Sequence, residues 1–395
     1  MRLIAFEIRK LFCSKITLIT VAAILIISSC MAISESHTWK KHIGDVDIFN
    51  KMVQPYEGKI DKKLASEINE KIEKKQSTSS DGYDTNSSLS YEERRKERFE
   101  GSYYSASNNA KMWKSDIYEN ADIPYTVTGL SNLCSTLEAR GQKDSYLYSD
   151  TLKHVNMLKV VGEPGYYNTK GWSGLFLFIA DLPGIIFISI ILLMVISPIF
   201  SNESRNNMQR IILSTKNGLR KIVSAKIIAS LVFTIAWVTL FYVVMYLLYL
   251  IPYGALTHGN IPLNSLYDYT YTPYNWTVVQ ALGVIYLTTL LSACTLATVF
   301  CLISSFQKKN LTSIACALMF VIAPMCIRDA GTIANVLILF PSSIMSGKVL
   351  FNSYISFNIM NTPIMYPSLA IIVLLLTSLV AILLTFKSYR RKIKA

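Results

Sequence analysis

Six long apolar segments constrain this chain more than any other feature of its sequence. Each approaches or exceeds the roughly 20 residues that a helix needs to cross the hydrocarbon core of a bilayer. They are Ile16–Ile33, Leu182–Phe200, Ile227–Ile251, Trp276–Ser305, Leu311–Ile327 and Pro363–Phe386. A backbone in lipid must satisfy its hydrogen bonds internally, so the pattern predicts an all-α polytopic membrane protein with six transmembrane helices. Residues 182–395 are predicted to contain the last five of them. A further apolar run, Gly331–Phe340, is too short to span, so the stretch 328–362 is predicted to be re-entrant or interfacial.

Charged residues are concentrated between the first two apolar segments. Of the 39 Lys and Arg residues in the chain, 20 lie between Glu35 and Lys170, together with 21 of the 26 Asp and Glu residues. This stretch is therefore nearly neutral, and the net charge of +13 belongs to the short segments that flank the apolar runs. That distribution excludes a strongly basic module that binds nucleic acid.

The charged stretch predicts one water-exposed domain over 34–181. Within it, apolar residues repeat every four positions in a background rich in Lys and Glu, and they are Ile60, Leu64, Ile68 and Ile72. This spacing places them on one face of a helix. The domain is therefore predicted to be mainly helical.

The first 15 residues form a separate amphipathic pattern. Its apolar members recur at helical spacing, and they are Leu3, Ile4, Ile8, Leu11 and Phe12. The polar residues Arg2, Glu7, Arg9, Lys10 and Lys15 lie largely off that stripe. Residues 1–15 are therefore predicted to form an interfacial helix with its polar face in water. The alternative is a simple positively charged flank of the first span, which covers 16–33 and is too long for the core of a signal peptide.

Positive charge predicts how the chain is oriented. The dense clusters of Lys and Arg precede the first apolar segment, follow the second, separate the fourth from the fifth, and follow the sixth. In a six-span arrangement all these clusters fall on one side of the membrane, which the positive-inside rule identifies as the cytoplasm. Both termini are then cytoplasmic, and the domain over 34–181 is extracellular.

Motifs that would make this chain an enzyme are absent from its sequence. It contains no GxxxxGK[ST], HExxH or GxSxG pattern, so we expect no catalytic residues, no cofactor and no metal on this chain. Asp181 is the one acid near the core of a span, and it is either a residue of a transport pathway or the cap of a helix with Pro183 in its first turn. The second interpretation is favoured. Whether Cys30 and Cys134 form a disulfide is left open.

The predicted cytoplasmic loop over 201–226 is the most informative polar stretch. Glu203 follows the second apolar segment, the apolar residues Met208 and Ile211 come next, and a break ending at Gly218 precedes a basic re-entry into the membrane. This stretch is either an ordinary loop or a short helix on which a partner protein can push.

The interfacial helix, the six spans and the loop pattern E-(x)11-T-K-x-G-(x)7-K resemble the ABC-2 type permeases. More narrowly, the chain resembles exporter permeases of Gram-positive bacteria that carry a large extracellular domain between spans one and two. The resemblance implies a bacterial cell-membrane protein that works with two copies of a separate ATPase, which binds ATP and Mg, and with a second permease subunit, identical or homologous. It also implies two short helices between spans five and six. The residues that would couple to the ATPase are Glu203, Met208, Arg210, Ile211, Thr215, Lys216, Gly218 and Lys226.

The expected function is export of a peptide or an amphiphile, such as an antimicrobial peptide. One alternative is a permease for sodium efflux. The other is a membrane-anchored sensor or immunity protein that binds a peptide outside the cell and transports nothing. Membrane lipid is an expected partner in each case.

Overall fold

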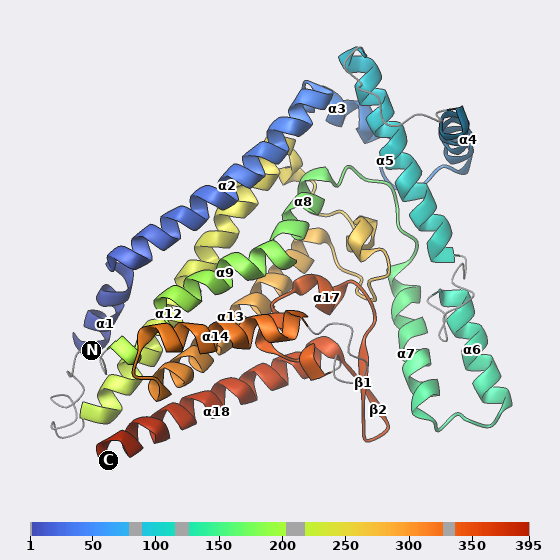
Figure 1. Cartoon of the computed structure of the whole chain (residues 1–395). Coiled ribbons are helices and arrows are strands. Elements are labelled where there is room, and N and C mark those ends of the chain that lie inside the picture. The colour runs from blue at the N-terminus through green and yellow to red at the C-terminus, as the bar shows by residue number, and fades with distance from the viewer. Residues whose placement is uncertain (1, 79–88, 115–125, 203–217, 327–335, 395) are drawn as a thin grey trace.

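The computed structural model describes residues 2–78, 89–114, 126–202, 218–326 and 336–394. Most of these residues are helical. Both termini lie at one end of a helix bundle, and the helices of the inserted domain lie at the opposite end (Figure 1). The terminal end holds α1 (Arg2–Phe12), the beginning of α12 (Gly218–Leu250) and the end of α18 (Tyr366–Lys394).

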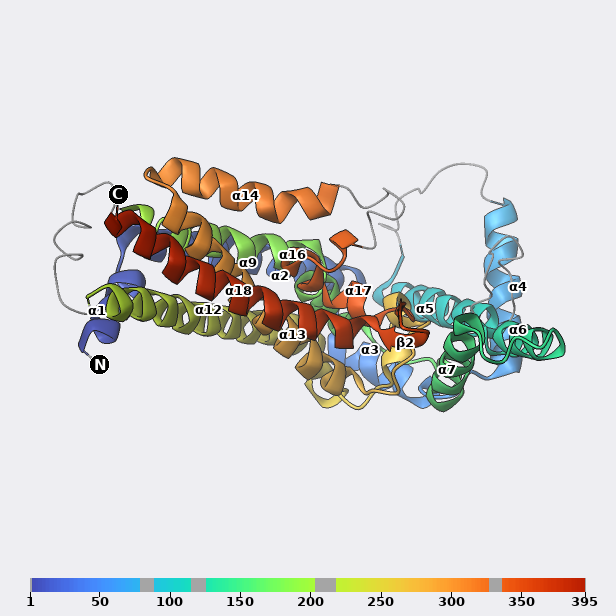
Figure 2. The ribbon, with the colours of Figure 1, turned by 90° about the horizontal axis from the view of Figure 1, so that it is seen from below.

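Four helices are long and apolar enough to cross a membrane. They are α2 (Lys15–Ile43), α12, α13 (Val278–Phe306) and α18. A fifth span results if α8 (Lys170–Ile179) and α9 (Leu182–Val195), which are bent by 41° relative to one another, count as one broken helix. These helices confirm a mostly helical protein that is embedded in a membrane. Helix α14 (Asn310–Cys326) is apolar but shorter, contains Pro324, and runs along one side of the bundle (Figure 2).

Two boundaries predicted from the sequence differ from those in the structure. The first apolar run ends at Ile33, but α2 continues to Ile43, because polar residues are compatible with a helix that has left the hydrocarbon. The inserted domain was predicted to extend to position 181, but α8 packs against α12 and belongs to the bundle. Gly184 permits the tight turn between α8 and α9, since a Cβ there would lie 2.5 Å from the carbonyl oxygen of Ile179.

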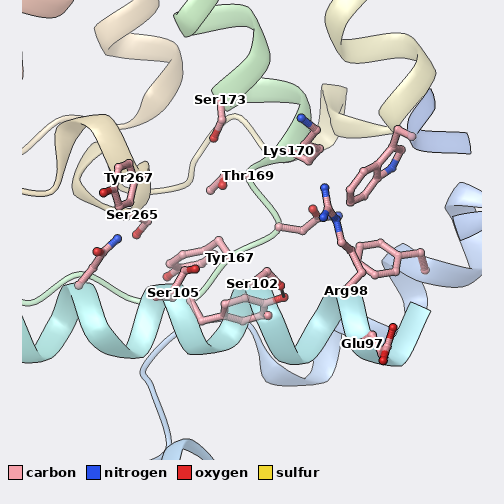
Figure 3. Close-up of a pocket in the computed structure, with 17 residues that line it drawn as sticks. Glu97, Arg98, Ser102, Ser105, Tyr167, Thr169, Lys170, Ser173, Ser265 and Tyr267 are labelled. Atoms are coloured by element: carbon pink, nitrogen blue, oxygen red, sulfur yellow. Dashed lines mark hydrogen bonds between the residues drawn. The ribbon is translucent and has the colours of Figure 1, made fainter. Parts of the chain in front are cut away.

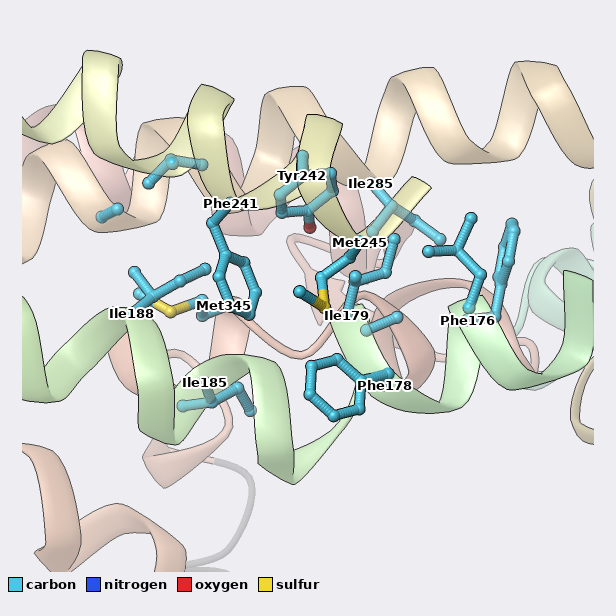
Figure 4. Packing of buried hydrophobic residues seen from close by; sticks show 14 of the residues in the cluster. Phe176, Phe178, Ile179, Ile185, Ile188, Phe241, Tyr242, Met245, Ile285 and Met345 are labelled. Carbon is cyan, nitrogen blue, oxygen red and sulfur yellow. The ribbon is translucent and has the colours of Figure 1, made fainter. Parts of the chain in front are cut away.

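Part of the buried core lies at this break between α8 and α9. Figure 4 shows side chains from α8, α9, α12 and α13 meeting there. Those labelled in the figure include Phe176, Phe178, Ile179, Ile185, Ile188, Phe241, Met245 and Ile285, and Met345, which lies outside these four helices, joins them. Close packing of this kind makes the bent pair a fixed element of the bundle.

The inserted domain is mainly helical, as predicted. Its helices are α3 (Val46–Val53), α4 (Lys62–Thr78), α5 (Tyr91–Lys114), α6 (Val127–Ala139) and α7 (Tyr146–Val161). Ala65 and Ile68 of α4 are buried in the same cluster as Phe99 and Tyr103 of α5. Helices α6 and α7 share a smaller cluster formed by Leu130, Val155 and Leu158.

The stretch before α18 departs from the all-α prediction. Two short helices, α16 (Pro341–Ile344) and α17 (Gly347–Phe351), precede an antiparallel hairpin of β1 (Ser356–Ile359) and β2 (Thr362–Met365). The connecting residues Met360 and Asn361 both have positive φ, which suits the tight turns of two-residue hairpins. The prediction was therefore wrong in omitting strands, and the last long apolar helix, α18, begins at Tyr366 rather than at Pro363.

The hairpin region is attached to α7 by a polar cluster. Asp150 Oδ1 accepts hydrogen bonds from the Tyr354 hydroxyl at 2.7 Å and from the Ser356 hydroxyl at 2.6 Å. The His154 ring stacks on the Tyr354 ring with centroids 4.2 Å apart. Burial lowers the pKa of His154 from 6.5 to about 4, against the opposing effect of Asp150.

We expect this attachment to weaken in acid because of His154. Its pKa is lower in the folded protein, so between pH 6.5 and pH 4 the unfolded chain binds more protons, and stability falls as the pH falls. By pH 4 the free energy of unfolding falls by up to roughly 3 kcal/mol. Unfolding measured against pH with the wild type and His154→Phe tests this, since the variant keeps an aromatic ring and does not titrate. Equal pH dependence in both proteins would contradict the prediction.

Candidate functional site

A buried ion pair joins α1 to α12 at the terminal end of the bundle. Lys226 is 0% exposed, and its Nζ lies 3.4 Å from Glu7 Oε2. The same ammonium donates a hydrogen bond to the carbonyl oxygen of Ile199 at 3.2 Å and lies 5.6 Å from the centroid of the Phe200 ring. Lys226 therefore connects α1, α12 and the chain that follows α9.

The position of Glu7 corrects the prediction for the amphipathic helix. The sequence placed Glu7 on the wet face of α1, but it is only 5% exposed and α1 packs along α12. Leu3, Glu7 and Leu11 are four residues apart and so share one face of the helix. That spacing was the available signal, and it was missed because a carboxylate is rarely buried without a partner.

The chain before residue 203 is also anchored to neighbouring helices. The backbone N–H groups of Phe200 and Ser201 donate to Ser304 Oγ of α13 at 3.0 and 3.1 Å. The Ser201 hydroxyl donates to Asn310 Oδ1 of α14 at 2.9 Å. The Phe200 ring also contacts Tyr389 of α18, with centroids 5.3 Å apart. Movement of this part of the chain would be transmitted to three helices.

Most of the predicted coupling residues lie outside the described part of the chain. These are Glu203, Met208, Arg210, Ile211, Thr215 and Lys216. Gly218 is the first residue of α12. Lys226 is brought into the site, but its side chain is buried and faces Glu7, so it positions helices and is not available for direct contact with a partner protein.

Asp181 caps α9, in agreement with the favoured interpretation. Its Oδ1 accepts a hydrogen bond from the N–H of Leu182 at 2.9 Å, and Pro183 stands in the first turn. Its other carboxylate oxygen lies 3.4 Å from Lys348 Nζ, which is also 3.0 Å from Asp268 Oδ1. This three-charge cluster was not predicted, because its members come from distant parts of the sequence.

The break between α8 and α9 also binds the segment around α17 through its backbone. The carbonyl oxygen of Ala180 accepts hydrogen bonds from the Lys348 N–H and the Ser346 hydroxyl, both at 3.1 Å. A helix that ends leaves carbonyl groups without intrahelical partners, and here one of them is satisfied by a distant segment.

Within the described ranges, no group of three or more His, Cys, Asp or Glu side chains is arranged to hold a metal ion. Cys30 and Cys134 are both free thiols. Comparison with protein-family models, with curated proteins and with solved structures finds no match for this chain.

Proposed function

We propose that this chain is the membrane-spanning permease subunit of an ATP-driven exporter. In this proposal α14 supplies the fifth of six spans, both termini are cytoplasmic, and the inserted domain is extracellular. Two permease subunits, identical or homologous, work with two copies of a separate ATPase that binds ATP and Mg. The setting is the bacterial cell membrane.

The observation that carries the proposal is the anchoring on both sides of residues 203–217. On one side, Phe200 and Ser201 are hydrogen-bonded to α13, and Ser201 is also hydrogen-bonded to α14. On the other side, Lys226 ties α12 to α1. A force applied by a partner between these anchors would reach most of the bundle, which is what coupling to an ATPase requires.

Positive charge supports the proposed orientation. The terminal end of the bundle carries Lys and Arg residues of α1, of the beginning of α12 and of α18 (Figure 1). Positive residues gather on the cytoplasmic side of membrane proteins. The inserted domain at the opposite end would then face outwards.

Co-purification tests the proposal. We expect a P-loop ATPase encoded beside this chain to purify with it in equal amounts, and failure to associate would contradict the proposal. For the substrate, we propose a peptide or an amphiphile. Efflux from intact cells, compared between sodium and cationic peptides, distinguishes that substrate from sodium.

A further inference from the structure

Two neighbouring hollows lie where the inserted domain meets the bundle. The inner hollow, of about 410 Å³, lies between α5 and the beginning of α8 (Figure 3). The outer hollow, of about 800 Å³, runs along α2. Trp39, Arg98 and Lys170 line both hollows and so form a shared wall. Volumes of this size are typical of sites for small ligands.

The outer hollow changes from apolar to polar along α2. Its apolar part includes Ile26, Ile27 and Met31, which are 63%, 51% and 46% exposed. Its polar part begins at Ser34 and includes Glu35 and the shared wall. Helix α2 is roughly 43 Å long, so it exceeds a hydrocarbon core of roughly 30 Å. The outer hollow therefore crosses from the hydrocarbon into the polar interface of the membrane.

Of the Lys and Arg side chains that line the outer hollow, one has no acidic partner among the described residues. Lys170 Nζ lies 2.7 Å from Glu35 Oε1, so these two charges offset one another. The Arg98 guanidinium lies 5.0 Å from the centroid of the Trp39 ring. Arg98 forms no ion pair with any residue that the structure describes. The neighbouring acid, Glu97, has contacts of its own and lines only the inner hollow, so it adds no negative charge to the outer one.

We propose that the outer hollow binds a phospholipid, with its phosphate at Arg98 and an acyl chain along Ile26, Ile27 and Met31. A guanidinium pairs with phosphate oxygens through charge-assisted hydrogen bonds, and apolar side chains at membrane depth match an acyl chain. Figure 3 shows Arg98 rising from α5 towards Lys170 of α8, where a headgroup would lie. The inference depends on the membrane setting and does not depend on an ATPase.

Cys30 provides the test, because it lines the outer hollow and is exposed. A full-length variant keeps Cys30 as its single cysteine, and the rate of its reaction with a maleimide is measured in detergent with added dioleoylphosphatidylglycerol. A second variant keeps only Cys316, which is exposed on α14 and serves as the control. We expect the lipid to slow labelling of Cys30 severalfold and to leave Cys316 unchanged.

Substitution of Arg98 tests recognition of the headgroup. We expect Arg98→Gln to require roughly tenfold more lipid for the same protection. Arg98→Lys keeps a positive charge and should retain most of the protection, and Lys96→Gln, on the exposed part of the same helix, should change nothing. Equal protection by a diacylglycerol, unchanged protection in Arg98→Gln, or protection by a cationic peptide in place of the lipid would overturn the proposal.

Discussion

Replacing Glu7 with leucine lowers the stability of the protein by roughly 3–5 kcal/mol. The reason is that Lys226 is fully buried, and removing the carboxylate 3.4 Å away takes its charge partner from a site that water does not reach. Arg9→Gln, on the exposed part of α1, should change stability by less than about 0.5 kcal/mol. Unfolding by sodium dodecyl sulfate in mixed micelles measures the free energies of these variants.

A double variant separates the ion pair from simple packing. Glu7→Leu combined with Lys226→Met removes both buried charges, and such replacements are often neutral or stabilising. We therefore expect the double variant to recover most of the stability that Glu7→Leu loses. If the two changes instead destabilise the protein additively, the pair is not the contact that joins α1 to α12.

Replacing Trp172 with alanine costs roughly 3–5 kcal/mol. Trp172 is 0% exposed, and its Nε1 donates a hydrogen bond to the carbonyl oxygen of Ala255 at 3.1 Å. The substitution leaves a cavity where the Trp172 ring packs, and it removes the hydrogen bond to Ala255 in the loop that follows α12. Trp172→Phe keeps much of the volume but loses the hydrogen bond, so a loss of roughly 1–2 kcal/mol is expected.

Thermal unfolding in detergent compares these two variants with the wild type. A Trp172→Ala protein as stable as the wild type would show that α8 is not packed into the bundle. It would also support the assignment of α8 to the inserted domain, which is the assignment that the sequence alone predicts.

Long apolar runs made the major helices predictable from the sequence. Helices α2, α12, α13 and α18 each contain one, and nothing but a helix satisfies so many backbone groups in lipid. Helix α8 was missed because Asp181 and Pro183 interrupt the run, leaving ten residues that are too few to suggest a span. The hairpin was missed because its strands have only four residues each, and Met360–Asn361 is a weak turn signal.

The candidate site was less predictable, since it depends on tertiary contacts. Asp181 was identified as a cap because capping is local and involves neighbouring residues. The Glu7–Lys226 pair joins residues 219 apart in sequence, and no local pattern indicates such a contact. Lys226 was selected through a resemblance, which predicted a role in coupling but not the burial of its side chain.

ATP turnover by the partner ATPase tests the proposed function most directly. The ATPase is assayed in lipid vesicles alone, with the wild-type chain and with Glu203→Ala. We predict that the wild-type chain raises ATP turnover and that Glu203→Ala abolishes most of this increase while the two subunits still associate. Equal turnover in all three samples would contradict the account.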